Sequence, residues 1–219
     1  MIKCEYCNRS FKQESRLETH MCENKRRWFN RDFSENKIGL ELFDLYYRLA
    51  LKSKPKTYDD FVKSKYFTGF VKLASFCINS KSLDHEAYLR WLVKNEIKMK
   101  SWCSDETYHR FVKDFMKKET IERALERFVE HASSLDYFHS FWETASGYLI
   151  ADWVEVGKIS PWILISSERA KARLQDLNQE QIEKIANCID FDYWQRKKNL
   201  NPIDIEWASR ILDGVSEDV

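Results

Sequence analysis

The feature that most constrains this chain is a set of potential metal ligands and apolar residues within its first 22 positions. Written out, the pattern is Cys4-x2-Cys7-x3-Phe11-x5-Leu17-x2-His20-x-Cys22. Paired thiols followed by an imidazole form the ligand set of a structural zinc site, and the two apolar side chains would form a miniature core. A segment of about 25 residues cannot bury enough apolar surface to fold alone, so bound Zn²⁺ is expected to supply the missing folding free energy.

This spacing resembles that of ββα zinc fingers, in which a hairpin supplies two thiolates and a helix supplies the imidazole. The fourth ligand departs from the family, whose second helical ligand follows the first by three to five residues, because positions 24–26 hold no plausible ligand. Cys22 lies two residues after His20, about 200° around a continuous helix. If Cys22 binds the metal, the helix must unwind at Met21 so that the chain doubles back.

We expect tetrahedral zinc ligation by Cys4, Cys7, His20 and Cys22. Disulfides or free thiols are the alternative. Disulfides are disfavoured because the chain opens with Met1-Ile2-Lys3, without a secretory signal. No apolar run approaches the roughly 18 residues that span a bilayer, so we expect an intracellular protein.

Composition favours a helical body. The 219 residues are 43% hydrophobic and 15% aromatic, with only five glycines and three prolines. Few breakers in a chain of this length favour helices over a turn-rich sheet. We therefore predict an all-α protein: a ββα zinc finger over 1–27, a basic-aromatic connector over 28–34, and a multi-helix globular domain over 35–219. The domain should hold about seven to nine helices, and 155–165 is the favoured place for a subdivision.

Apolar periodicity and capping residues place these helices. Helical patterns run over 38–51, 66–78 and 120–133, and the aromatic-rich stretch 135–154 is expected to pair with the last of them. Further helix starts are expected at Thr57, Asp84, Ser104 or Asp105, Asn178 and Pro202. Pro161 fits the first turn of a short helix, with a lone strand over 162–165 as the alternative.

A net charge of +1 conceals a basic N-terminus, because residues 1–31 carry eight bases and four acids. Residues 25–31 interleave basic and aromatic side chains, which suits phosphate contact and stacking on bases. The expected phosphate contacts are Lys25, Arg26, Arg27 and Arg31. An equally weighted alternative is that Trp28, Phe29 and Phe33 dock the finger onto the body while the charges stay solvated.

The resemblance to DNA-reading ββα fingers implies that Gln13, Arg16 and Thr19 face base edges. Arg16 could pair with guanine and Gln13 with adenine, whereas the acids Glu14 and Glu18 oppose phosphate approach. A lone finger reads about three base pairs and binds weakly, so the basic segment or a partner would have to help. Many lone fingers instead present the helix to another protein.

The body carries no catalytic signature: no phosphate loop, His-Glu-x-x-His motif, nucleophile elbow or Rossmann glycine fingerprint. His85, His109, His131 and His139 are isolated, which favours packing or surface roles. The run 193–199 is a second aromatic-basic patch. It could contact nucleic acid, although a solvated helix end with a buried Trp194 is favoured. We therefore expect a non-enzymatic protein.

The whole chain also resembles uncharacterised proteins of T-even-like contractile-tailed phages. The matching features are the finger with its His-x-Cys ending, the following Lys-Arg-Arg, and the stretches 57–64, 124–127, 159–162 and 192–197. This resemblance implies a viral accessory protein working in the cytoplasm of a bacterial host.

The leading functional prediction is a zinc-dependent nucleic-acid-binding accessory factor, with DNA favoured, acting in phage replication, recombination or transcription. The alternative is a structural or adaptor protein that uses the finger to dock on a phage or host protein. Neither hypothesis requires a membrane or a small-molecule substrate.

Overall fold

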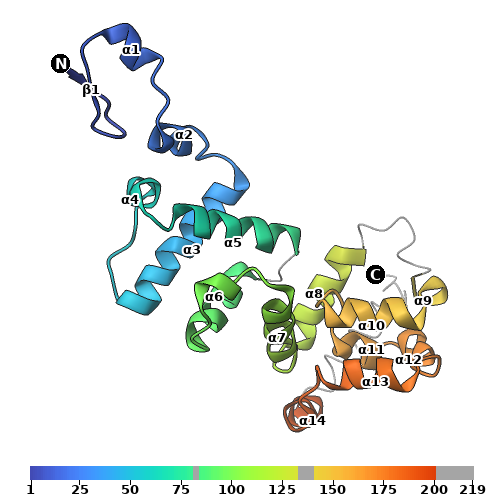
Figure 1. The fold of residues 1–219 in the computed structure, drawn as a ribbon. Coiled ribbons are helices and arrows are strands. Elements are labelled where there is room, and N and C mark those ends of the chain that lie inside the picture. The colour runs from blue at the N-terminus through green and yellow to red at the C-terminus, as the bar shows by residue number, and fades with distance from the viewer. Residues whose placement is uncertain (81–83, 133–140, 201–219) are drawn as a thin grey trace, which may run out of the picture. The chain divides into compact units, whose positions relative to one another are not determined.

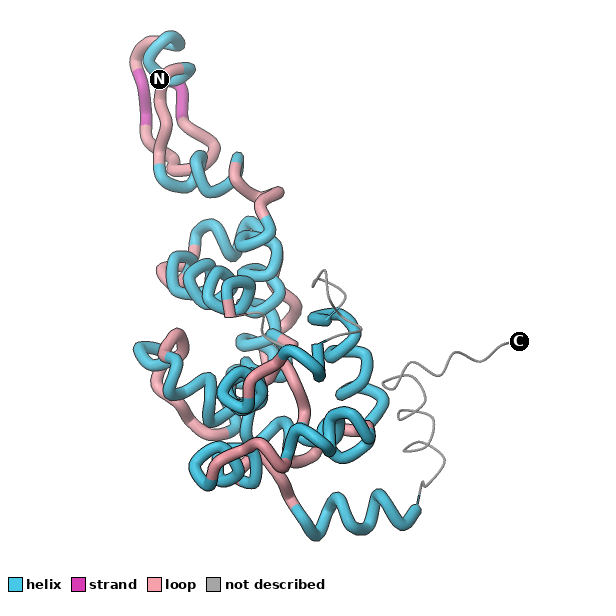
Figure 2. The backbone as a smooth tube through the Cα atoms, turned by 90° about the vertical axis from the view of Figure 1, so that its right-hand side faces the viewer, coloured by secondary structure: helices cyan, strands magenta, loops and turns pink. Residues whose placement is uncertain are grey.

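The structure, a computed structural model, describes residues 1–80, 84–132 and 141–200 (Figure 1). Within these ranges the chain is helical except for one two-stranded hairpin at its N-terminal end, which confirms the all-α fold class and the initial hairpin (Figure 2). The chain forms two compact units, Met1–Ser104 and Asp105–Val219. The subdivision expected within 155–165 therefore falls inside the second unit, and each unit is described separately.

The first unit begins with the hairpin and a short helix. Strand β1 (Ile2–Lys3) pairs antiparallel with β2 (Ser10–Phe11), so that Ile2 lies opposite Phe11. The helices that follow are α1 (Glu14–Glu18), α2 (Glu23–Phe29), α3 (Ser34–Leu51), α4 (Tyr58–Lys63), α5 (Phe67–Asn79) and α6 (His85–Lys94), with a 3₁₀ turn at Met99–Ser101. Helix α2 crosses the boundary expected at 27/28, so one helix joins the end of the expected finger to the start of the basic-aromatic connector.

The core of this unit lies where α3 packs against α5 and α6. Gly39 permits close approach, because a Cβ atom there would lie 3.2 Å from Cζ of Phe61 and 3.5 Å from Cα of Val71. Phe43 fills the space between the helices, with its ring centroid 5.1 Å from that of Phe61 and 5.4 Å from that of Phe70. Of the apolar residues in the 38–51 periodicity, Leu42, Phe43 and Leu45 are buried here, whereas Leu49 and Leu51 near the end of the helix are exposed.

Two of the predicted helix starts in this unit are confirmed in atomic detail. Thr57 and Asp60 form a capping box: the Thr57 hydroxyl accepts from the Asp60 amide, and the Asp60 carboxylate accepts from the Thr57 amide at 2.9 Å. Asp84 caps α6 by accepting from the backbone N–H of Ala87 at 2.9 Å. Each cap satisfies a backbone donor that the first helical turn leaves unpaired.

The second unit is formed by the remaining helices. They are α7 (Asp105–Met116), α8 (Ile121–Ala132), α9 (Phe141–Thr144), α10 (Gly147–Glu155), α11 (Pro161–Ser166), α12 (Glu168–Leu174), α13 (Gln179–Ala186) and α14 (Phe191–Leu200). Pro161 begins a helix, so the alternative strand over 162–165 is wrong, and the capping box of Asn178 is confirmed. The helix expected from Pro202 lies outside the described residues. Every helix within them is too short or too polar to cross a bilayer.

Buried polar and aromatic groups organise the second unit. Arg127 pairs with Glu119, both nearly inaccessible, and also donates to the carbonyl of Gly157. The Trp162 ring stacks on the Trp194 ring with centroids 4.1 Å apart. Trp194 is therefore buried, as favoured from the sequence, and it belongs to this packing rather than to an exposed patch.

Candidate metal centre and its flanking surface

Four side chains from the first 22 residues converge on one point. One ligand atom each from Cys4, Cys7, His20 and Cys22 lies within 4.8 Å of the others. The Cys7 sulfur lies 3.3 Å from Nε2 of His20. Tetrahedral zinc, with bonds of about 2.3 Å to sulfur and about 2.0 Å to nitrogen, requires ligand separations of roughly 3.5–3.8 Å. The four ligand atoms lie close enough to these separations to hold one metal ion, and their thiolate-rich donor set suits zinc rather than calcium or magnesium.

The hairpin turn brings the first two thiols together. The backbone N–H of Cys4 donates to the carbonyl of Arg9 at 2.9 Å, and that of Asn8 donates to the carbonyl of Cys4 at 2.8 Å. Asn8 turns the chain with a φ of 60°, in the left-handed region that asparagine tolerates better than most residues. Backbone hydrogen bonds thus close the turn that carries Cys4 and Cys7.

A break in the helix admits the fourth ligand. Helix α1 ends at Glu18 with Thr19 as its C-cap, and α2 begins at Glu23. Cys22 is the N-cap of α2, and its sulfur accepts a hydrogen bond from the backbone N–H of Lys25 at 3.4 Å. The chain is therefore non-helical around Met21, which is the unwinding that ligation by Cys22 requires. A thiolate at this position also meets the positive end of the α2 dipole.

The surroundings of the first two thiols shift their pKa values in opposite directions. Burial alone would raise the pKa of the Cys4 thiol, but the backbone N–H groups of Cys7 and Tyr6 favour the thiolate and lower the pKa overall. For Cys7, the backbone N–H of Arg9 lowers the pKa, but burial and the neighbouring Cys4 and Cys22 outweigh it and raise the pKa. Crowded thiols resist joint ionisation, and a bound dication removes that repulsion.

Apolar packing around this centre is slight. Of residues 1–22, all of which the structure describes, Cys4 alone is buried, with 3% of its surface exposed. Phe11 and Leu17 are half-buried, and the Phe11 ring lies 4.7 Å from the His20 ring between centroids. Of the two residues predicted to form a miniature core, Phe11 packs against the imidazole of His20, and neither is fully buried. Residues 1–22 contain all four candidate ligands, and from here on we use the term finger for these residues rather than for the expected 1–27.

The side chains expected to read bases lie on the short helix of the finger. Gln13, Arg16 and Thr19 are all exposed, with Gln13 as the N-cap of α1 and Thr19 as its C-cap. The Thr19 hydroxyl donates to the carbonyl of Ser15 at 3.0 Å. Helix α1 has five residues, so it is only about 7.5 Å long. Glu14 and Glu18 are exposed on the same helix.

Of the basic residues expected to contact phosphate, Arg27 has another role. Its guanidinium donates to the carbonyls of Val62 at 2.8 Å and Ser64 at 3.3 Å, and lies 4.4 Å from the centre of the Phe67 ring. The neighbouring Trp28 ring packs on the Tyr58 ring with centroids 5.4 Å apart. Arg27 and Trp28 therefore attach α2 to α4 and α5. This supports the docking alternative for Trp28, whereas Arg27 is neither a free phosphate contact nor one of the solvated charges that this alternative expected.

Other members of the segment face solvent. The side chains of Arg26 and Arg31 are 64% and 47% exposed, although each lies near an acid, Glu23 at 3.5 Å and Asp32 at 3.9 Å. Phe29 is 57% exposed and Phe33 is 60% exposed, so neither ring docks the finger through burial. Lys25 is half-buried and donates to the carbonyl of His20 at 3.3 Å. We call Arg26, Phe29, Arg31 and Phe33 the basic-aromatic surface.

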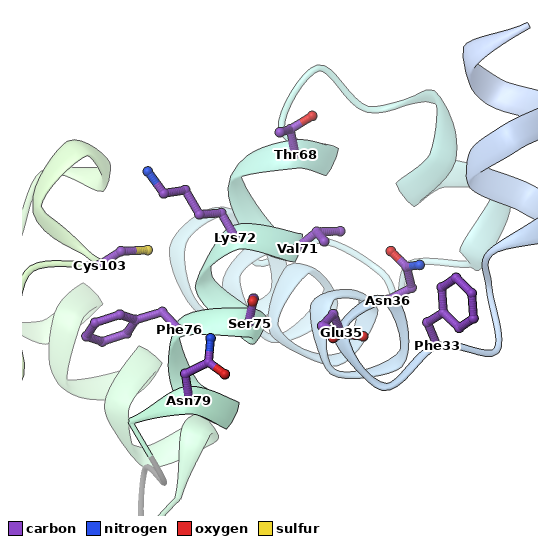
Figure 3. A pocket seen from close by; sticks show the side chains of 10 residues that line it. All are labelled: Phe33, Glu35, Asn36, Thr68, Val71, Lys72, Ser75, Phe76, Asn79 and Cys103. Carbon is purple, nitrogen blue, oxygen red and sulfur yellow. The ribbon is translucent and has the colours of Figure 1, made fainter.

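An open cavity of about 710 Å³ adjoins this surface (Figure 3). Phe33 and Asn36 stand at one end, and Phe76 and Cys103 stand at the other. The remaining lining comes largely from α5, with Lys72 among it. Sequence reasoning did not point to this cavity, because it forms between residues that are distant along the chain and share no motif.

Comparison with protein-family models, with curated proteins and with solved structures gives no significant match to this chain. The candidate metal centre and the basic-aromatic surface beside it are the features that point to a function. Elsewhere in the described ranges His85 lies 3.3 Å from a carboxylate oxygen of Glu41, and no second group of three or more metal-ligating side chains converges there.

Proposed function

We propose that the finger binds zinc and that, with the basic-aromatic surface, it binds nucleic acid as a non-catalytic accessory factor. The observation that carries this proposal is the exposure of Arg26 and Arg31 beside two exposed aromatic rings, on a segment anchored to the helical core. Cations supply attraction to phosphate, and flat rings supply stacking on bases.

The role of zinc in this proposal is structural. All four candidate ligands come from the protein, which is typical of a closed structural site without an open coordination position. Cys22 also begins α2, so metal ligation would link the finger to the helix that carries Arg26 and Phe29. Zinc would thus hold α1 and its exposed Gln13, Arg16 and Thr19 in a fixed relation to the basic-aromatic surface.

The resemblance to proteins of T-even-like phages supports a setting for this activity. The resemblance suggests a viral accessory protein in the cytoplasm of a bacterial host, and we propose that its role there is in replication, recombination or transcription. The near-neutral charge of the whole chain, +1, suits a factor whose binding is confined to one basic region while the rest of the molecule engages other proteins.

A second candidate function is that of an adaptor protein. The observation favouring it is the exposed Phe33 at the end of the cavity, since aromatic rings beside a concave surface are common in protein interfaces. The exposed acids Glu14 and Glu18 also suit a protein partner better than a phosphate backbone.

Salt-dependent binding tests the proposal. The zinc-loaded protein should bind labelled nucleic acid at about 50 mM salt and lose most of that affinity by about 200 mM, because bound phosphates release counterions. The double variant Arg26→Ala/Arg31→Ala should bind more weakly and reduce the logarithmic salt slope by about 1.5–2. Arg90→Ala is the matched control, since Arg90 is similarly exposed on α6 and also pairs with an acid one turn away.

Absence of binding to duplex, single-stranded DNA and RNA at low salt would refute the proposal. A partner protein that stays bound after nuclease treatment, and is lost when Phe33 is replaced, would instead support the adaptor function.

A further inference from the structure

We infer that the preferred ligand of this surface is a single-stranded nucleic acid whose bases stack on Phe29 and Phe33. This inference rests on the proposed nucleic-acid binding and specifies the form of nucleic acid. Bases of a single strand are accessible on their faces, whereas those of a duplex are stacked inside it.

Phe33 is presented on a fixed backbone. It is the N-cap of α3, and its N–H donates to the carbonyl of Asn30 at 3.1 Å. The side chain of Asn36, which is 7% exposed, donates to the same carbonyl at 2.6 Å. These bonds close the turn of residues 30–33 against the start of α3. A ring that is 60% exposed therefore stands on an ordered support and loses little entropy when a base covers it.

Phe29 is held in a comparable way. It is the last residue of α2, the helix that Arg27 and Trp28 attach to α4 and α5. One side of its ring lies near Tyr6, with centroids 6.5 Å apart, and the ammonium of Lys25 is 6.0 Å from its centre. More than half of the residue still faces solvent, so a stacking face remains available.

The charges around the rings fit a strand backbone. Arg26 precedes Phe29, and Arg31 lies between the two rings in sequence. Beyond Phe33 the cavity contains the exposed Lys72 on α5, which offers a further phosphate contact. Glu23 lies beside Arg26, Asp32 lies beside Arg31, and Glu35 lines the cavity with Lys72. These acids oppose the cations, so the attraction is moderate and should be strongly salt-dependent.

The finger itself is poorly suited to a duplex. A helix of five residues presents little more than one turn, whereas major-groove recognition uses a helix laid into a groove about 12 Å wide. Phe29 and Phe33 have no function in such docking. A single strand uses both rings and the flanking arginines, so it accounts for more of the exposed features than a duplex does.

The test compares three ligands of one 20-nucleotide sequence: single-stranded DNA, single-stranded RNA and duplex DNA. Affinities of the zinc-loaded full chain are measured by fluorescence anisotropy at about 50 mM salt. Single strands should bind at least tenfold more tightly than the duplex, and the DNA and RNA arms identify the preferred sugar. Phe29→Ala and Phe33→Ala should each weaken single-strand binding about tenfold, and the double variant about a hundredfold.

Three further variants identify the physical cause. Phe29→Leu and Phe33→Leu keep an apolar side chain but remove the flat ring, so they should not restore affinity. Phe191→Ala is the matched control: Phe191 begins α14 in the second unit and is 68% exposed, so its replacement should leave affinity unchanged. The phenylalanine variants should keep the wild-type zinc content and salt slope, because stacking involves no counterion release.

The outcomes separate this inference from the proposed function. Tighter binding to duplex, or unchanged single-strand affinity in the double alanine variant, would overturn the stacking inference while nucleic-acid binding stood. Full affinity in the leucine variants would show that apolar contact rather than base stacking is responsible. Absence of any nucleic-acid binding by the wild-type protein would refute both the stacking inference and the proposed function.

Discussion

The finger and the helical core of the first unit are held together by different forces. In residues 1–22 only Cys4 is buried, and regular structure consists of two-residue strands and one five-residue helix. In the core, Leu42, Phe70 and Leu73 have no exposed surface. The core can therefore fold by removing apolar surface from water, whereas the finger depends on converging ligand atoms.

The difference shows how a small module can be attached to a large one without sharing its core. Arg27 uses hydrogen bonds to backbone carbonyls of the α4–α5 segment, and Trp28 adds one aromatic contact. Tyr58 completes the junction, because its hydroxyl donates to the Arg27 carbonyl at 2.7 Å. The junction is polar and local, so loss of one region should leave the other largely intact.

The largest expected effect is the loss of the metal site. Cys4→Ser should leave residues 1–22 unfolded, because zinc coordination in comparable peptides supplies about 10–16 kcal/mol of apparent free energy. Amide NMR signals of the finger should collapse to unfolded positions while those of α3 and α5 stay dispersed. Cys103→Ser is the control, since Cys103 is a half-buried thiol outside the cluster. Collapse of the core signals as well would contradict the independence of the two regions.

Cys22→Ser sharpens the same test. If Cys22 is a ligand, zinc affinity should fall as it does for Cys4→Ser, whereas the start of α2 should be kept, because a serine hydroxyl can accept from the Lys25 N–H as the N-cap. Wild-type zinc affinity in this variant would mean that the site has three protein ligands and an exchangeable fourth group.

The converse test removes a buried side chain from the helical core of the first unit. Phe70→Ala should destabilise the helical core by about 3–5 kcal/mol, because a fully buried ring is lost beside Phe43 and Tyr46. Zinc stoichiometry should nevertheless stay at the wild-type value under conditions where the core remains folded. The measurement is denaturant unfolding followed by helical circular dichroism, with zinc content measured in parallel. Loss of zinc at full helicity would show that the finger depends on the core.

The features that the sequence predicts correctly are those that depend on short, local residue patterns. The convergence of four ligands follows from their spacing and from the chemistry of thiolate and imidazole. The capping boxes at Thr57 and Asn178 each involve residues three positions apart, and both are present. Period and spacing describe a single element well, because the contacts concerned lie within that element.

The features that the sequence does not predict depend on contacts between residues that are far apart along the chain. Arg27 looked like a phosphate contact because nothing near it in sequence shows that carbonyls 35 and 37 positions later accept its hydrogen bonds. The cavity beside Phe33 likewise requires α3 and α5 to be packed. Helix α12 was not predicted, because its short, charged sequence gives only a weak apolar stripe, and α14 was predicted only as a helix end at 193–199.

A smaller effect is expected at the junction itself. Arg27→Ala should lower the stability of the first unit by about 1–3 kcal/mol, because two carbonyls lose a charged donor and Phe67 loses its cation contact. Arg26→Ala is the matched control, since its guanidinium is mostly exposed. Thermal unfolding compares the two variants. Equal effects would show that Arg27 contributes no more than a surface charge, and the proposed attachment of α2 would be wrong.

The smallest expected effect concerns the cap of α4, which presents Tyr58 to the junction. The backbone N–H and the hydroxyl of Thr57 donate to the Asp60 carboxylate and hold its pKa below the ordinary value. A carboxyl group with a lowered pKa in the folded state contributes stability above its unfolded pKa of about 4, and loses it as pH falls through the lower folded value.

Asp60→Asn should therefore cost about 0.5–1 kcal/mol at pH 7. The difference from wild type should shrink below about pH 4, where the wild-type carboxylate also becomes protonated. Asp59→Asn on the same helix is the control, because Asp59 pairs with Lys63 at the surface and does not cap the helix. Unfolding free energies measured from pH 7 down to pH 3 give the comparison, and a difference that stays constant over that range would mean that the charge of Asp60 does not stabilise the cap.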